Sequence, residues 1–146
     1  GVKLKHNANR AIIEGKRVIL VDDSIVRGTT SRKIVEMVRR AGAAEVHMRI
    51  SSPPTAHPCY YGIDTPEKEE LMASRFDLAG MAREIGVDSL AYISMDGLYR
   101  AMGEAGRNNE SPQFCDACFS GEYPITVFDR KSGKAPAQLS LLSERS

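Results

Sequence analysis

The sequence predicts an α/β fold that contains part of a doubly wound parallel sheet, followed by a loop-rich C-terminal segment. Three observations predict it. Short apolar runs alternate with helical patterns as far as about residue 102, which is typical of parallel strands joined by crossover helices. One run is apolar throughout, as expected of a strand that is buried on both faces. From Gly103 onward turn-forming residues dominate.

The first strand and the first helix are predicted by two adjacent patterns. Residues 17–21 include four successive apolar residues, which favours a buried parallel strand. Residues 31–41 then carry apolar side chains at helical spacing, and Gly42 is a typical helix stop. The face of this helix that we expect to be buried consists of Ile34, Val35, Val38 and Ala41.

A second strand and a break follow. Residues 45–50 alternate apolar and polar side chains, which predicts a strand with one polar face. Residues 51–54 read Ser-Ser-Pro-Pro and interrupt the pattern. Thr65 then predicts the start of another helix, because it is a suitable cap, Pro66 suits the first helical position and Glu67 suits the first turn.

The remaining elements have clear boundary signals. Asp77 is the expected cap of a helix that Gly86 ends, with an apolar face made of Leu78, Met81, Ala82 and Ile85. Residues 90–93 predict a short strand, and Ser94 is the expected cap of a helix that reaches about Met102. The tail over residues 137–146 has little to pack against and is expected to fray.

Composition limits the class of protein. The 146 residues, 42% of them hydrophobic, suffice for one globular core. The 20 basic and 19 acidic residues give a net charge of +1, so no charged field points to nucleic acid. No apolar run approaches the about 20 residues of a membrane span, and no signal-peptide pattern is present. We therefore expect a cytoplasmic protein with no membrane partner. The odd number of cysteines, three, argues against a disulfide framework.

The strongest functional signal lies where the first strand ends. Asp22 and Asp23 follow the strand directly, and a loop of small and hydroxyl-bearing residues leads into the next helix. Ligands of open α/β sheets bind beyond the carboxyl ends of strands. Backbone N–H groups at a helix start suit a phosphate, and paired carboxylates suit sugar hydroxyls or a divalent metal. A solvated strand end followed by a simple helix cap is the plain alternative, but the complete string favours a site for a sugar phosphate.

This string resembles the ribose-phosphate motif of the type I phosphoribosyltransferases, and in its detail it resembles the glutamine phosphoribosylpyrophosphate amidotransferases. That family catalyses the first committed step of purine synthesis. Further matching segments give a resemblance over roughly residues 2–124: they are residues 2–10, 57–64, 88–90, 97–98 and 115–124. A phosphoribosyltransferase domain needs more strands than this chain supplies. We therefore expect residues 1–103 to be the C-terminal half of such a domain, and residues 104–146 to be an extension that carries a Cys-x-x-Cys pair and the frayed tail.

The resemblance implies roles for residues of the motif. Asp22 and Asp23 would hold the ribose hydroxyls, directly or through Mg²⁺. The loop would hold the 5′-phosphate through backbone N–H groups and hydroxyls. Two interpretations of Arg27 stay open from the sequence. In one it contacts the phosphate; in the other it points outward or pairs with another segment. The expected substrate-binding residues are Asp22, Asp23, Ser24, Ile25, Val26, Arg27, Gly28, Thr29 and Thr30.

The resemblance also implies a reaction and its partners. Ammonia released from glutamine would attack C1 of phosphoribosyl pyrophosphate and expel pyrophosphate, giving 5-phosphoribosylamine. The glutaminase domain and its cysteine nucleophile would lie elsewhere in the polypeptide, so this chain supplies no catalytic nucleophile and is expected to be inactive alone. The implied partners are phosphoribosyl pyrophosphate, purine nucleotide feedback inhibitors, the glutaminase domain and further copies of the protein in a homo-oligomer.

The three cysteines form a second candidate site. A Cys-x-x-Cys pair such as Cys115 and Cys118 could be a redox pair, half of a zinc site or two ligands of an iron–sulfur cluster. The resemblance implies that Cys59, Cys115 and Cys118 bind a structural [4Fe–4S] cluster whose fourth ligand lies outside this chain. A zinc site completed by His57 or His6 is the competing interpretation. Residues 108–124 have few apolar side chains, so we expect this segment to depend on the cluster for its position.

Two other functional classes remain open from the sequence. A phosphoribosyltransferase that acts on a purine or pyrimidine base would need a base-recognition segment and would have no use for the three cysteines. A non-catalytic nucleotide-binding regulator of the same fold would keep Asp22, Asp23 and the loop but lose turnover.

Overall fold

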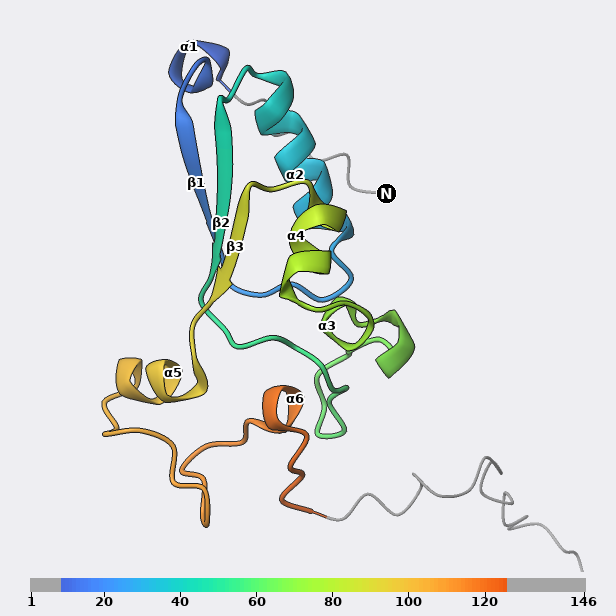
Figure 1. Ribbon diagram of the computed structural model, residues 1–146. Coiled ribbons are helices and arrows are strands. Elements are labelled where there is room, and N and C mark those ends of the chain that lie inside the picture. Colours follow the sequence, from blue (N-terminus) through green and yellow to red (C-terminus); the bar gives the residue numbers. More distant parts are fainter. Residues whose placement is uncertain (1–8, 126–146) are drawn as a thin grey trace, which may run out of the picture.

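Among the described residues, three parallel strands form a sheet at the centre of the fold (Figure 1). The computed structural model describes residues 9–125, so the expected frayed tail, His6 and most of the segment 2–10 lie outside the described residues. The strands are β1 (Arg17–Asp22), β2 (Glu45–Ile50) and β3 (Ser89–Tyr92), in the order β1-β2-β3. The register places Asp22 opposite Ile50, and Ile50 opposite Tyr92. The carboxyl ends of all three strands therefore meet at one edge of the sheet.

The helices differ greatly in length. The two longest, α2 and α4, lie on the same side of the sheet, whereas α5 and α6 lie beyond the carboxyl ends of the strands (Figure 1). In residues 9–125, no helix combines the length and the hydropathy that a membrane span requires. The helical elements are α1 (Arg10–Ile13), α2 (Thr29–Arg40), the 3-10 turn η1 (Lys68–Glu70), α3 (Met72–Arg75), α4 (Leu78–Ile85), α5 (Met95–Ala101) and α6 (Ala117–Ser120).

The core forms between the sheet and its helical layer. Val46, Met48 and Ile50 turn the apolar face of β2 inward, and each is at most 3% exposed. Val35 and Val38 of α2 pack on this face, so the alternation predicted for β2 is confirmed. The parallel α/β arrangement is confirmed as well. The division at residue 103 stays a prediction.

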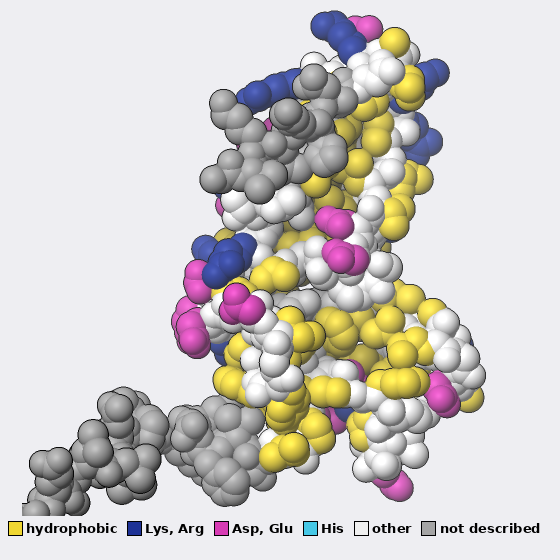
Figure 2. All heavy atoms as spheres, turned by 180° about the vertical axis from the view of Figure 1, so that it is seen from behind, with side chains coloured by type: hydrophobic (Ala, Val, Ile, Leu, Met, Phe, Trp, Pro, Cys, Tyr) yellow, Lys and Arg dark blue, Asp and Glu magenta, His cyan; other side chains and the backbone are white. Residues whose placement is uncertain are grey.

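β1 departs from the strand that the sequence predicts. It is an edge strand in residues 9–125, and Ile19 and Val21 are 64% and 75% exposed. Figure 2 shows that hydrophobic side chains reach the surface of the molecule when it is seen from behind. Only Val18 and Leu20 pack against the core. The expected burial of both faces is therefore wrong for the described residues, because α2 and α4 cover one face of the sheet and no described helix covers the other.

The predicted helix ends are correct where the capping side chain bonds to a donor in the same turn. The Asp77 carboxylate accepts a hydrogen bond from the Gly80 N–H (2.7 Å), and Gly86 ends α4 at φ 87°. The Ser94 hydroxyl caps α5 in the same way by accepting from the Gly97 N–H (3.0 Å). These predicted boundaries are confirmed.

The helix predicted to start at Thr65 does not form there. The Thr65 hydroxyl instead accepts a hydrogen bond from the Cys59 N–H (2.7 Å), so it is not available as a cap. Residues 65–67 have no helical structure, and two short turns, η1 and α3, follow. Leu71 between these turns is fully buried. Burial of this segment therefore overrides the local helix signal.

Candidate functional site

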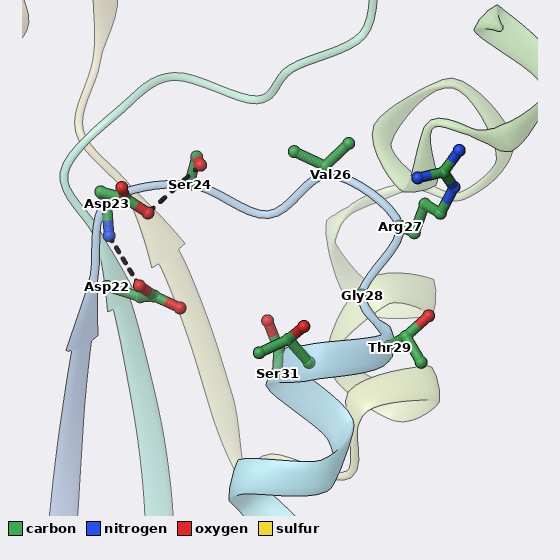
Figure 3. Close-up of a pocket in the computed structure, with 9 residues that line it drawn as sticks. Asp22, Asp23, Ser24, Val26, Arg27, Gly28, Thr29 and Ser31 are labelled. Carbon is green, nitrogen blue, oxygen red and sulfur yellow. Dashed lines mark hydrogen bonds between the residues drawn. The ribbon is translucent and has the colours of Figure 1, made fainter. Parts of the chain in front are cut away.

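A hollow of about 470 Å³ opens beyond the carboxyl end of β1 (Figure 3). Its walls come from the strand end, the following loop and the first turn of α2. Every predicted site residue except Ile25 lines it, and Ser31 is added. The lining residues are Asp22, Asp23, Ser24, Val26, Arg27, Gly28, Thr29, Thr30 and Ser31.

The two carboxylates lie side by side at the strand end. Asp22 is the last residue of β1 and its side chain points towards the first turn of α2 (Figure 3). The Asp23 N–H donates to Asp22 Oδ1 (3.0 Å), and the Ser24 hydroxyl donates to Asp23 Oδ1 (3.2 Å). Within residues 9–125, the other oxygen of each carboxylate accepts no hydrogen bond. Both carboxylates can therefore accept from sugar hydroxyls or bind a hard cation such as Mg²⁺.

The loop leaves its backbone donors available. The first helical hydrogen bond at the start of α2 runs from the Arg32 N–H to the Gly28 carbonyl (2.9 Å). For residues 26–31, no acceptor of the backbone N–H is found in the described part of the chain. Gly28 stands at the N-cap position and has no side chain to cap these donors. Such a helix start suits a phosphate, since unpaired N–H groups and the helix dipole both favour an anion.

Buried residues hold the loop from beneath. The Ile25 side chain is 1% exposed and belongs to the core. Contact between residue 25 and a ligand is therefore limited to its backbone. The Met72 N–H donates to the Val26 carbonyl (2.8 Å), so α3 is attached directly to the loop. The sequence offered no sign of this support, because it joins segments more than forty residues apart.

Arg27 pairs with a different segment of the chain. Its Nε lies 3.2 Å from Glu70 Oε1, and its side chain points away from Asp22 and Asp23 (Figure 3). The hydrogen bond from Arg27 holds the pKa of Glu70 below its ordinary value. Of the two interpretations that the sequence left open, the structure shows the pairing with another segment.

Ser31 is the site residue that the sequence reasoning missed. It is 3% exposed and lines the hollow from the first turn of α2. The signal was present, since a hydroxyl directly after Thr29 and Thr30 occupies the same helix start.

The three cysteines lie in a second region, where Cys118 neighbours both of the others. The thiols of Cys59 and Cys118 lie close enough for each to affect the pKa of the other, and Cys115 lies close enough to interact electrostatically with Cys118. The Cys118 carbonyl accepts hydrogen bonds from the N–H groups of Ala56 and His57 (both 3.1 Å). These contacts join the segment around Cys59 to α6, although 59 residues of sequence separate the two thiols.

The surroundings of the two paired thiols differ. Backbone N–H groups lower the pKa of Cys59, chiefly that of Tyr61, which lies 3.4 Å from the sulfur. Burial raises the pKa of Cys118 to about 11, and the neighbouring Cys59 adds to the effect. Donors therefore converge on Cys59, whereas Cys118 is the more shielded thiol.

Metal binding is not evident from side-chain placement alone. Among the described residues, no three His, Cys, Asp or Glu side chains are grouped as a ready metal site. The His57 ring lies against Gly121, where an added Cβ would stand 2.8 Å from its Nε2. Both the cluster and the zinc interpretation therefore remain predictions.

Comparison with known proteins gives consistent matches. No family model matches the chain. It is 56% identical over 144 residues to an amidophosphoribosyltransferase of Rhizobium etli, which covers 98% of this chain and 29% of that protein. It is 53% identical to the Bacillus subtilis amidophosphoribosyltransferase, over 88% of this chain and 27% of the relative.

Solved structures agree with the sequence matches. The glutamine phosphoribosylpyrophosphate amidotransferase from B. subtilis, complexed with ADP and GMP, superimposes with a TM-score of 0.79 at 52% identity. The match covers 89% of this chain and 28% of that one. A structure described as the allosteric regulatory enzyme of purine biosynthesis gives a TM-score of 0.77 at 51% identity. The chain therefore belongs to the amidophosphoribosyltransferase family, and it spans somewhat over a quarter of the length of these relatives.

Proposed function

We propose that this chain forms the phosphoribosyl-binding part of an enzyme that makes 5-phosphoribosylamine from phosphoribosyl pyrophosphate and glutamine. One observation carries the proposal: unpaired N–H groups at the start of α2 and two adjacent carboxylates line the same hollow. A ribose 5-phosphate has the matching chemistry, with an anion at one end and hydroxyls at the other. The relatives named amidophosphoribosyltransferase support the same reaction.

In this proposal the protein acts by positioning and charge. The loop amides and the hydroxyls of Ser24, Thr29 and Thr30 hold the 5′-phosphate, while Asp22 and Asp23 hold the ribose. The ammonia lone pair forms the new bond to C1 as the bond from C1 to the pyrophosphate oxygen breaks, and pyrophosphate leaves with the electron pair. The ammonium group formed at C1 then loses one proton to solvent, which gives the amine. Positive charge develops on the sugar in the transition state, and nearby carboxylates stabilise it.

Mg²⁺ is the cation that we propose for the carboxylates. Asp22 and Asp23 fit it, since each keeps one carboxylate oxygen without a hydrogen bond in the described residues. The cation would supply charge that neutralises the pyrophosphate group. The residues themselves orient the ribose whether they bind it directly or through the metal.

A [4Fe–4S] cluster is the group that we propose for Cys59, Cys115 and Cys118, with a fourth ligand from outside these 146 residues. Three thiols that share one region and an N–H group directed at the Cys59 sulfur suit a cluster bound by thiolates. Tyrosine rings pack on one another directly after Cys59 in the sequence: the Tyr60 and Tyr123 rings lie 5.1 Å apart, and Tyr61 and Tyr123 lie 6.1 Å apart. The role would be structural, because the proposed reaction transfers no electron.

Partners and location follow the same proposal. The relative solved with ADP and GMP supports purine nucleotides as inhibitors, since these carry the same ribose 5′-phosphate unit as the substrate. We also propose a glutaminase domain in the same polypeptide, a homo-oligomeric enzyme and a cytoplasmic location. Nothing favours a base-specific phosphoribosyltransferase or a non-catalytic regulator.

Substrate binding to the natural full-length protein tests the proposal. Asp22→Asn and Asp23→Asn each remove charge-assisted hydrogen bonds that contribute about 1.5–3 kcal/mol. Calorimetric titration with phosphoribosyl pyrophosphate and Mg²⁺ should show affinity lowered about 10- to 150-fold. Glu36→Gln, in the exposed part of α2 outside the hollow, is the control and should bind as the unmodified protein does. Unchanged affinity in both aspartate variants would contradict the proposal.

A further inference from the structure

The Cys-x-x-Cys loop contains a buried carboxylate that does not face the thiols. Asp116 lies between Cys115 and Cys118 in sequence and is 5% exposed. Its Oδ2 accepts a hydrogen bond from Arg107 Nε and lies 2.8 Å from the Tyr99 hydroxyl. Its Oδ1 accepts from Arg107 Nη2 (3.2 Å) and from the Ser120 hydroxyl (2.8 Å). Both oxygens are therefore fully engaged within the protein.

The partners of Asp116 connect the loop to the folded core. Tyr99 is 1% exposed and belongs to α5, which follows β3 directly. Its hydroxyl also lies 3.1 Å from the Phe114 carbonyl, on the other side of Cys115. The Arg107 N–H donates to Asp96 Oδ1 (3.0 Å), again in α5. The loop is thus attached to α5 by several polar contacts, and α5 and α6 lie near each other in Figure 1.

Arg107 is a buried cation with three acidic or amide partners. Its side chain is only 8% exposed, and it contacts Asp116, Asn109 and Glu122. A planar guanidinium that forms hydrogen bonds with two carboxylates fixes their relative directions. Removal of one partner from such a buried pair leaves an uncompensated charge, so this pair constrains the geometry strongly.

Apolar burial contributes little here. Within residues 104–125, Ala117 is the one apolar residue that is fully buried. Asp116 and Ala117 are the two residues between Cys115 and Cys118 in sequence. Because both are buried, this is the part of the loop that faces the interior. None of the contacts that Asp116 and Arg107 make involves a cysteine sulfur.

We propose that the Arg107–Asp116 pair positions Cys115 and Cys118 before any metal binds. Asp116 and Arg107 are then positioning residues, and neither is a ligand. This changes the expectation that residues 108–124 depend on the cluster for their position. The pair also explains how Cys118 reaches Cys59: with α6 fixed, the Cys118 carbonyl can accept from Ala56 and His57. Only the identity of the metal rests on the proposed function.

Hydrogen exchange in the metal-free protein tests the proposal. The natural full-length protein is stripped with a chelator under reductant, and exchange is followed at Phe119, Ser120 and Gly121, whose N–H groups bond to Asp116 and Ala117 carbonyls. These amides should remain protected in the unmodified protein. Asp116→Asn and Arg107→Met should raise their exchange rates at least tenfold and speed alkylation of Cys118. Glu122→Gln is the matched control, since Glu122 contacts the same arginine but is 64% exposed, and it should change both rates less than twofold.

Two further measurements separate the possible failures. Binding of phosphoribosyl pyrophosphate should be unchanged in all three variants, which shows that the fold and the first site are intact. Iron uptake under anaerobic conditions should fall at least tenfold in Asp116→Asn. If the amides are protected only after the metal has bound, or if Asp116→Asn matches the unmodified protein, the positioning role is wrong. If the metal-free loop is protected but the unmodified protein takes up no iron, the cluster proposal fails and the positioning role stands.

Discussion

Gly28 lies directly against Met72. A Cβ added to Gly28 would stand 2.5 Å from the Met72 sulfur, and the backbone of Gly28 has φ 78°. The N–H of Met72 donates to the carbonyl of Val26, two residues earlier in the loop. The loop of residues 24–28 and α3 are therefore in contact through both backbone and side chain, and the shape of the loop depends on a glycine at this position.

Substitution at Gly28 should be more harmful than the backbone conformation alone explains. Gly28→Ala places a side chain at positive φ, which costs about 1–2 kcal/mol, and adds the contact with Met72, which costs about 1–3 kcal/mol more. Gly15→Ala is the matched control, because Gly15 has φ 70° and nothing within 4 Å of the added Cβ. Urea unfolding should therefore rank Gly28→Ala below Gly15→Ala in stability. Equal losses would show that the Met72 contact does not constrain the loop.

Inorganic phosphate should bind at the start of α2. The amides of residues 26–31 have no acceptor in the described structure. When the full-length protein is titrated with phosphate, hydrogen exchange at these amides should become slower. The amides of α4, which is capped by Asp77, serve as the internal control and should not respond. A response spread evenly over both helices would argue against a defined phosphate site.

The ion pair between Arg27 and Glu70 should stabilise the protein only above acidic pH. Arg27 lowers the pKa of Glu70 from its ordinary 4.5, so the folded state binds this proton more weakly than the unfolded state does. The contribution is therefore present above about pH 4.5 and is lost as the pH falls through the lowered pKa. Glu70→Gln should have a lower Tm than the unmodified protein at pH 7, and the two should converge near pH 3.

The Arg27–Glu70 ion pair also predicts how little phosphate affinity depends on Arg27. Because Arg27 is engaged by Glu70, Arg27→Ala should change phosphate affinity less than about threefold, equivalent to under 1 kcal/mol. A much larger loss would show that Arg27 leaves Glu70 when the ligand binds.

Metal analysis should distinguish the two interpretations of the cysteines. Anaerobically purified full-length protein should contain about four irons per chain, as a single [4Fe–4S] cluster requires, and should be brown. Cys59→Ser and Cys118→Ser should each lose most of this iron. Phosphate binding in these variants serves as the control for folding. Stoichiometric zinc without iron in the unmodified protein would contradict the cluster.

The sequence predicts those features that depend on residues only a few positions apart. Asp77 and Ser94 cap helices with donors three residues away, and the alternation of β2 appears directly as Val46, Met48 and Ile50 facing the core. Asp22, Asp23 and the loop can be singled out as a candidate site from the sequence, because carboxylates, hydroxyls and a helix start coincide within one short string.

Features that join distant segments were not predictable in this way. Thr65 looks like a helix cap, but its hydroxyl accepts from Cys59. Met72 supports the loop that follows β1 from 44 positions beyond Gly28. The four-residue helices α1 and α6 are too short to show a period of 3.6. The partner of a buried charge such as Asp116 depends on the completed fold.

The exposed side of β1 affects the solubility of the chain. Ile19 and Val21 point into solvent from a strand that has β2 on one side and no described strand on the other. An open, apolar strand edge is a template for pairing with another chain. When the 146-residue chain is expressed by itself, it should self-associate in a concentration-dependent way. A partner that covers β1 should then raise its solubility.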